Sequence, residues 1–139
     1  MRVSLWVPLS ILALLPVQAS AQATLPDVAE SAKRAVLAHD AAALVGQSSS
    51  LVLQIPGADA SSPLGRAQAV ELLRRYLRPA EERSLDITAI REVEAGQGFI
   101  ELTRRYVVAG TTELRHETLF LGYRFVATEW RLVELRSAP

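Results

Sequence analysis

The sequence predicts an α+β domain in which helices cover one face of an antiparallel sheet. Three observations predict this class. Two segments in the first half of the chain carry apolar side chains at helical spacing, and a short alternating run lies between them. From residue 84 onward, four longer runs with strand-like composition follow one another. The turns between these runs are short and contain glycine or small residues, which fits antiparallel hairpins and a meander of four strands.

The segment LPDVAESAKRAVLAHDAAALVGQ is predicted to be helical, because its apolar residues recur every three or four positions. Asp27 is the predicted N-cap, and Glu30 stands three residues later, at the spacing of a capping box. We interpret His39 and Asp40 as a break in this helix. The first helix ends at His39, and Asp40 caps a second, shorter one.

A short strand is predicted within residues 48–57. Leu51, Leu53 and Ile55 alternate there with other residues, and a Pro-Gly pair follows them. The next segment, residues 58–65, has two alanines, two serines, one proline and one glycine. It is therefore predicted to be a loop.

Residues 65–79 have the pattern of an amphipathic helix. At about 100° per residue, the apolar side chains fall in one arc: Ala69, Val70, Leu72, Leu73, Tyr76 and Leu77. The opposite arc carries Arg74, Arg75 and Arg78, and Glu71 is placed to pair with the first two. We interpret this arc as a solvated helix face. The alternative is an electrostatic site that binds polyanions in a salt-sensitive way.

Four strands are predicted at residues 84–94, 99–108, 112–126 and 130–137. In the second and third strands, both faces carry apolar residues. A flat sheet with one buried face does not give this pattern, whereas a strongly curved or bulged sheet does. The prediction is a curved sheet, in which alternation alone does not identify the residues that line a pocket.

Residues 1–21 have the three parts of a secretory signal peptide. An arginine supplies the positive charge, Val3–Leu15 form the apolar stretch, and small residues precede cleavage positions after Ala21 or Ala23. The apolar stretch is about thirteen residues long, shorter than the roughly 20 that cross a bilayer. We therefore expect export to the periplasm or the medium, followed by a single domain at residues 24–139 without a transmembrane segment.

Composition excludes several classes of function. The chain has 15 Lys and Arg against 15 Asp and Glu, so it lacks the net positive charge of a general nucleic-acid binder. It has no cysteine, which excludes disulfides, thiolate nucleophiles and cysteine-held metals. Its two histidines are far apart, and the sequence has neither a glycine-rich phosphate loop nor a G-x-S-x-G motif. We predict no metal site and no cofactor.

His116 has several reactive side chains near it. It lies in the middle of a predicted strand, beside Glu117, and Glu101 is expected across the hairpin. A histidine beside carboxylates is able to act as a general base, and Tyr106 is a tyrosine that such a site would use. The alternative, which we favour, is a ladder of opposite charges on a solvated sheet face. Asp86 is expected to face solvent. His116, Glu101 and Tyr106 are therefore pocket candidates, and no catalytic residue is assigned.

Three stretches carry a family pattern: HDAAALVGQSSSLVLQIPG, GRAQAVELLRRYL and EWRLVELR. Together with the order of the elements, they resemble the nuclear transport factor two-like superfamily, which has a cystatin-like curved sheet wrapped around helices. Within it, they are most similar to the branch called domain of unknown function forty-seven eighty-three. The helix pattern of that branch is matched by Gln68, Ala69, Leu73 and Tyr76. Leu77 departs from it, because an aromatic pair is common there.

The resemblance covers about residues 28–136 and implies a fold without a defined activity, because the branch carries no catalytic residues. It also implies a cone between sheet and helices, and a sheet through which members of the superfamily form homodimers. We therefore expect a non-catalytic exported domain that binds a small apolar ligand or a protein partner. The alternative is a small isomerase- or cyclase-type enzyme, which requires an acid–base site inside the cone.

Overall fold

The computed structural model describes residue 3 and residues 23–139, except residue 57. The predicted signal peptide lies outside the described residues, apart from residue 3. The helices are α1 (Leu25–Leu37), α2 (Ala41–Val45) and α3 (Arg66–Leu77). The strands are β1 (Ser50–Gln54), β2 (Leu64–Gly65), β3 (Ala80–Glu94), β4 (Gln97–Val108), β5 (Leu114–Val126) and β6 (Glu129–Ala138). No helix of the described part of the chain is long and apolar enough to cross a membrane.

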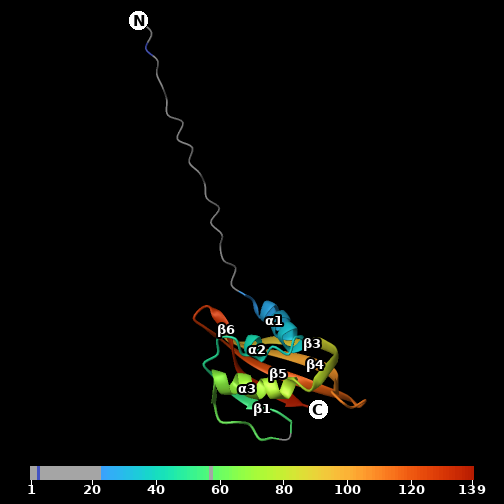
Figure 1. Cartoon of the computed structure of the whole chain (residues 1–139). Coiled ribbons are helices and arrows are strands. Elements are labelled where there is room, and N and C mark those ends of the chain that lie inside the picture. Colours follow the sequence, from blue (N-terminus) through green and yellow to red (C-terminus); the bar gives the residue numbers. More distant parts are fainter. Residues whose placement is uncertain (1–2, 4–22, 57) are drawn as a thin grey trace.

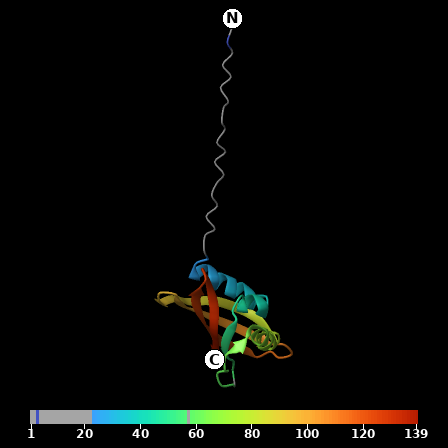
Figure 2. The same ribbon diagram turned by 90° about the vertical axis from the view of Figure 1, so that its left-hand side faces the viewer.

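The six strands form one sheet in the order β2-β1-β6-β5-β4-β3. Strands β3 to β6 form the predicted antiparallel meander, and β1 pairs in parallel with β6 at the far side of it. Figures 1 and 2 show the helices against one face of a strongly curved sheet. The α+β class and the curved sheet on N-terminal helices are therefore confirmed. The segment predicted as the loop 58–65 contains the two-residue strand β2 at its end.

The prediction for the start of α1 was wrong by three residues. Thr24 is the N-cap, and Asp27 occupies the third helical position. The Thr24 hydroxyl accepts a hydrogen bond from the Asp27 N–H (3.3 Å), and the Asp27 carboxylate accepts one from the Thr24 N–H (3.0 Å). Asp27 is thus the reciprocal partner in the capping box, the role that we had assigned to Glu30. The hydrogen bonds from Thr24 lower the pKa of the Asp27 carboxyl.

The break between α1 and α2 lies where the sequence predicts it. His39 adopts a positive φ of 54°, and its N–H donates to the Val36 carbonyl. A left-handed residue ends a helix because it turns the backbone out of the helical path. The Asp40 carboxylate then accepts a hydrogen bond from the Ala43 N–H at 3.0 Å, which caps α2 as predicted.

The core lies between the helices and the inner face of the sheet. The predicted apolar arc of α3 contributes Ala69, Val70, Leu73 and Leu77, all buried, with Leu72 and Tyr76 half-buried around them. From the sheet, β4 and β5 contribute Ile100, Leu102, Leu119 and Leu121.

Register shifts explain why the strands did not separate into one apolar and one polar face. Three interrupt the β3–β4 pairing, at Glu82/Ser84, Ile87/Ala89 and Glu92/Glu94. A fourth interrupts the β5–β6 pairing, at Gly122/Tyr123. Because each extra residue reverses the alternation and increases the local twist, a side chain of either parity reaches the core.

Candidate functional site

The inner face of the sheet changes from apolar to polar toward one end. Along β4, the buried residues Ile100 and Leu102 are followed on the same face by Arg104 and Tyr106, since every second side chain of a strand shares a face. Glu117 of β5 lies directly opposite Arg104 in the β4–β5 register. Arg104 is 0% exposed and Glu117 is 3% exposed. Charged groups buried this deeply require partners.

Arg104 has its partner in Glu82 of β3. Its Nε donates to Glu82 Oε2 at 3.2 Å, and its Nη2 donates to the other carboxylate oxygen. The guanidinium carbon lies 4.2 Å from the ring centroid of Tyr106 and 5.6 Å from that of Tyr76. His39 Nε2 lies 3.7 Å from Glu82 Oε1. This cluster joins the end of α1, α3, β3 and β4 through polar contacts inside the core.

Tyr106 connects this cluster to Glu117. Its hydroxyl donates a hydrogen bond of 2.8 Å to Glu117 Oε2. Burial raises the pKa of the Glu117 carboxyl. The nearby Ser137 hydroxyl lowers this pKa in part, although the two side chains do not form a hydrogen bond. Glu117 Oε1 is buried and has no hydrogen-bond partner among the described residues. The pair therefore offers a buried carboxyl group that holds a proton more tightly than a solvated one, is held by a tyrosine, and has one oxygen without a partner among the described residues.

Tyr106 and Glu117 line a pocket of about 480 Å³, which we call the inner pocket. It is bounded by the end of β1, the segment after it, the start of β5 and the C-terminal residues. The lining comprises Gln54, Ile55, Pro56, Ala58, Tyr106, Glu113, Arg115, His116, Glu117, Ser137 and Pro139. It thus combines an apolar side, formed by Ile55, Pro56 and Ala58, with a polar base.

The structure divides the sequence-predicted candidates between the two faces of the sheet. Tyr106 lies on the inner face and lines the inner pocket. His116 also borders that pocket, but it is exposed and pairs with Arg105 in the β4–β5 register, so its side chain shares the outer face with Glu101. Glu101 lies on the opposite face from Tyr106, because the two positions differ in parity along β4. Its carboxylate accepts a hydrogen bond from the Thr88 hydroxyl at 3.0 Å. Asp86 is exposed, as predicted.

Sequence reasoning did not single out Arg104 or Glu82. Strand parity could have identified Arg104, because it continues the alternation of Ile100 and Leu102 and therefore lies on the same face. Parity did not identify Glu82 as a residue of the inner face. A register shift follows Glu82 in β3, so the alternation of the later residues does not extend back to it. No group of described residues is arranged to hold a metal ion.

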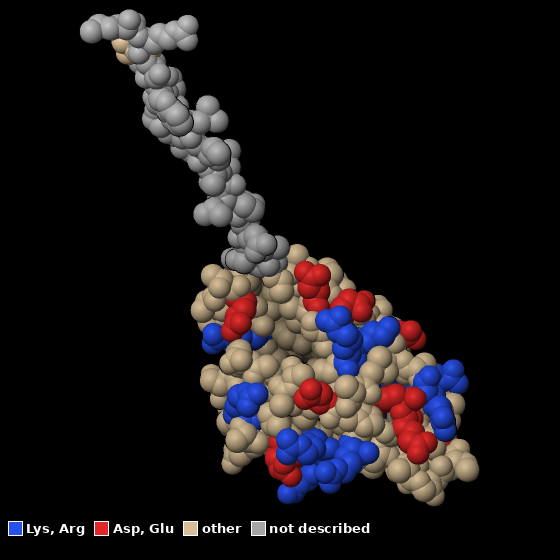
Figure 3. All heavy atoms as spheres, turned by 45° about the horizontal axis from the view of Figure 1, so that its top comes forward, with Lys and Arg blue, Asp and Glu red and all other residues tan. Residues whose placement is uncertain are grey.

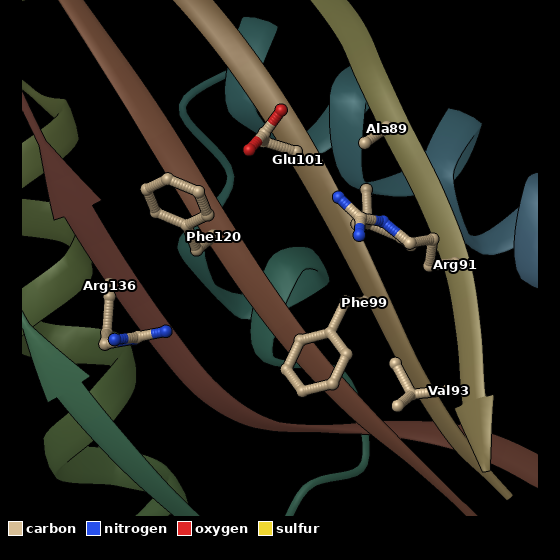
Figure 4. A pocket seen from close by; sticks show the side chains of 8 residues that line it. Ala89, Arg91, Val93, Phe99, Glu101, Phe120 and Arg136 are labelled. Atoms are coloured by element: carbon tan, nitrogen blue, oxygen red, sulfur yellow. The ribbon is translucent and has the colours of Figure 1, made fainter.

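A second pocket, of about 200 Å³, lies on the outer face of the sheet (Figure 4), and we call it the outer pocket. Its lining comprises Ala89, Arg91, Val93, Phe99, Ile100, Glu101, Phe120 and Arg136. It is separated from the inner pocket by the sheet itself.

The arginines of α3 are partly neutralised on the helix. Glu71 accepts from Arg74 at 2.7 Å and from Arg75 at 3.2 Å, as the helical spacing predicts. With Arg78, these residues line a surface groove of about 610 Å³. Figure 3 shows acidic side chains among the basic ones on the face it displays. This arrangement fits the solvated helix face that we favoured.

Solved structures share this fold at very low sequence identity. A DUF4783 family protein from Bacteroides ovatus superposes with a TM-score of 0.66 at 9% identity, over 84% of this chain and 96% of that chain. A ketosteroid isomerase-like protein from Erwinia carotovora atroseptica gives 0.67 at 15% identity, over 87% and 99%. An NTF-2 like protein of unknown function from Shewanella oneidensis gives 0.61 at 12% identity, over 82% and 95%. By sequence, no protein-family model and no curated protein matches the chain.

The domain therefore has the nuclear transport factor two-like fold, which confirms the fold that the resemblance implies. DUF4783 family proteins are among its structural neighbours, and they represent the branch to which the sequence motifs are most similar. At these identities the likeness shows the fold alone.

Proposed function

We propose that this protein binds a small, mainly apolar molecule in the inner pocket, with a hydrogen-bond acceptor of the ligand placed at Glu117. The observation that carries the proposal is the Tyr106–Glu117 pair, in which a half-buried tyrosine holds a buried carboxyl group in the lining of a pocket large enough for such a molecule. A neutral carboxyl group donates one hydrogen bond, and Glu117 Oε1 has no partner among the described residues. An acceptor oxygen of a ligand would satisfy it.

Simple binding explains the pocket better than catalysis does. The Tyr106–Glu117 pair resembles a donor pair for an oxyanion, which is one half of an isomerase-type site. The other half is a base on the opposite side of the substrate. Within the lining, His116 and Glu113 are the groups available for that role, and both are exposed at the rim. A solvated base is less able to hold a fixed position than a buried one.

Binding is testable with Nile red, a neutral apolar dye that carries a carbonyl acceptor. We expect its fluorescence to rise on binding, and Tyr106→Phe and Glu117→Gln to weaken the affinity about fivefold to tenfold through altered hydrogen bonding. Asp86→Asn makes the same kind of change at an exposed position of β3 and is the matched control. A dye affinity that is equal in all four proteins would refute the proposal. Native mass spectrometry of the gently purified protein would also report a retained ligand.

The enzyme alternative rests on the raised pKa of Glu117 beside Tyr106. It predicts that the protein accelerates the conversion of 3-cyclohexenone to its conjugated isomer, which absorbance follows directly. The acceleration should disappear in Tyr106→Phe and in His116→Asn. A rate equal to that of buffer, in a protein that binds Nile red, would leave binding as the function.

We also propose that the domain acts after export, in the periplasm or outside the cell. The support comes from the N-terminal sequence, with its apolar stretch and its small residues before Ala21 and Ala23. A protein partner, and a homodimer through the sheet, remain predictions from the resemblance.

A further inference from the structure

The outer pocket is lined by aromatic and charged side chains that take no part in the proposed function. Phe99 is 41% exposed and Val93 is 60% exposed, so apolar side chains face solvent there. Phe99 of β4 and Phe120 of β5 present their rings on the same face, and Figure 4 shows both beside the hollow. Exposed aromatic residues gathered in a concave place are a common mark of a binding site.

A glycine lies beside the exposed ring of Phe99. Gly122 lies directly opposite Phe99 in the β4–β5 register. A Cβ atom at that position would lie 3.5 Å from Cε1 of Phe99 and 3.4 Å from Cβ of Glu134. Any larger side chain would therefore pack onto the face of the sheet beside the Phe99 ring. With glycine there, the ring stays accessible.

Two arginines extend toward the rings from opposite sides. Figure 4 shows Arg91, on β3, and Arg136, on β6, both directed over the hollow. Arg91 makes no ion pair with the described residues. Arg136 uses its Nε for Glu134, at 2.9 Å, and lies 5.9 Å from the ring centroid of Phe120. Because a guanidinium has five N–H donors, Arg136 keeps donors for a ligand.

The lining contains two arginines against one carboxylate, Glu101, so its net charge is positive. Glu101 has its own partner, since the Thr88 hydroxyl donates to its carboxylate. The lining therefore combines two cationic groups with one acidic group that is already hydrogen-bonded. A volume of about 200 Å³ has room for one aromatic ring with a short substituent.

We propose that the outer pocket binds small molecules that combine an aromatic ring with a carboxylate. The ring lies against Phe99 and Phe120, and the carboxylate lies between Arg91 and Arg136. Aromatic pairing favours the ring, and charge-assisted hydrogen bonds favour the anion. This site is independent of the inner pocket, and either one can exist without the other.

The test is an NMR titration of the isotope-labelled protein with phenylacetate and, separately, with phenylacetamide, its neutral counterpart. We expect saturable binding of phenylacetate in the millimolar range, with amide shifts at residues 89–93, 99–101 and 120–122. Phenylacetamide should bind about tenfold more weakly. Shifts confined to the inner pocket, equal binding of both compounds, or no saturable binding would overturn the proposal.

Variants then distinguish the contribution of the two arginines to binding from the contribution of the space in the pocket. Arg91→Gln and Arg136→Gln should each weaken phenylacetate binding about tenfold. Arg105→Gln removes an exposed arginine from β4 outside the pocket and should leave binding unchanged. Ala89→Leu keeps both arginines but fills the hollow, so it should abolish binding. Unchanged affinity in Ala89→Leu or in both arginine variants would count against the site.

Discussion

The guanidinium of Arg104 lies 4.2 Å from the centre of the Tyr106 ring, and the hydroxyl of that tyrosine donates to Glu117. Arg104 is held in turn by Glu82. A buried ion pair in the core thereby orients the phenol that forms the base of the inner pocket. The stability of the fold and the shape of the inner pocket therefore both depend on the Arg104 side chain.

Replacing Arg104 by methionine should destabilise the domain by about 3–5 kcal/mol, because Glu82 is then left buried without its partner. Urea denaturation measures the change. Arg83→Met removes a cation from the exposed pair with Glu81, at 3.6 Å, and should cost less than about 1 kcal/mol. Equal stabilities of the two variants would contradict the importance of the buried pair.

The double variant Arg104→Met with Glu82→Leu should be more stable than Arg104→Met alone. Removing both charges abolishes the unpaired buried carboxylate and leaves apolar side chains of similar length in its place. The same denaturation experiment decides it. If the second replacement lowers stability further, the cost of Arg104→Met comes from lost packing around Tyr76 and Tyr106.

Glu117→Gln should change how stability depends on pH. Burial raises the pKa of Glu117 above its ordinary value of 4.5. The folded state therefore binds the proton more tightly than the unfolded chain, and this stabilisation is complete below pH 4.5 and is lost as pH rises through the folded pKa. Relative to the wild type, Glu117→Gln should thus gain stability as pH rises from about 4 to 8. Parallel stability curves for the two proteins over that range would refute the assignment.

The turn between β5 and β6 is predicted to gain stability from glycine. Ala127 and Thr128 both adopt positive φ, 49° and 71°, in a two-residue hairpin loop. This turn type prefers Asn-Gly, and a β-branched residue at positive φ costs about 1 kcal/mol. Thr128→Gly should therefore raise the melting temperature. Thr112→Gly, at a position whose own φ is not positive, is the control and should lower it.

Processing of the N-terminus is open to direct measurement. In an exporting bacterial host, the mass of the mature protein should correspond to a chain that begins at Gln22 or Thr24. Ala21→Leu places a large side chain at the −1 position of one cleavage site and at the −3 position of the other, so it should block both. A full-length chain in the exported fraction of the unaltered protein would contradict the signal peptide.

Local rules were sufficient for most of the fold. The spacing of apolar residues located α1 and α3. Asp40 was predicted as a cap from its residue type at the break after His39, and its bond to the Ala43 N–H confirms it. The sequence analysis placed the first cap at Asp27 and did not consider Thr24, the residue that caps α1. Both residue types are common at N-caps. The curvature of the sheet was also predicted, because a strongly curved or bulged sheet places apolar residues on both faces of a strand.

The candidate sites depend on relationships that are not local. Which face of the sheet Glu101 and Tyr106 occupy follows from strand parity, but which face is buried depends on where the register shifts occur. Glu82 and Arg104 are 22 residues apart and meet because β3 and β4 pair and the helices close over them. By itself, the sequence determined the class of fold, the main elements and the absence of cysteine chemistry. The tertiary structure decided which charged residues are buried together, because desolvation and pairing depend on what the chain brings near them in space.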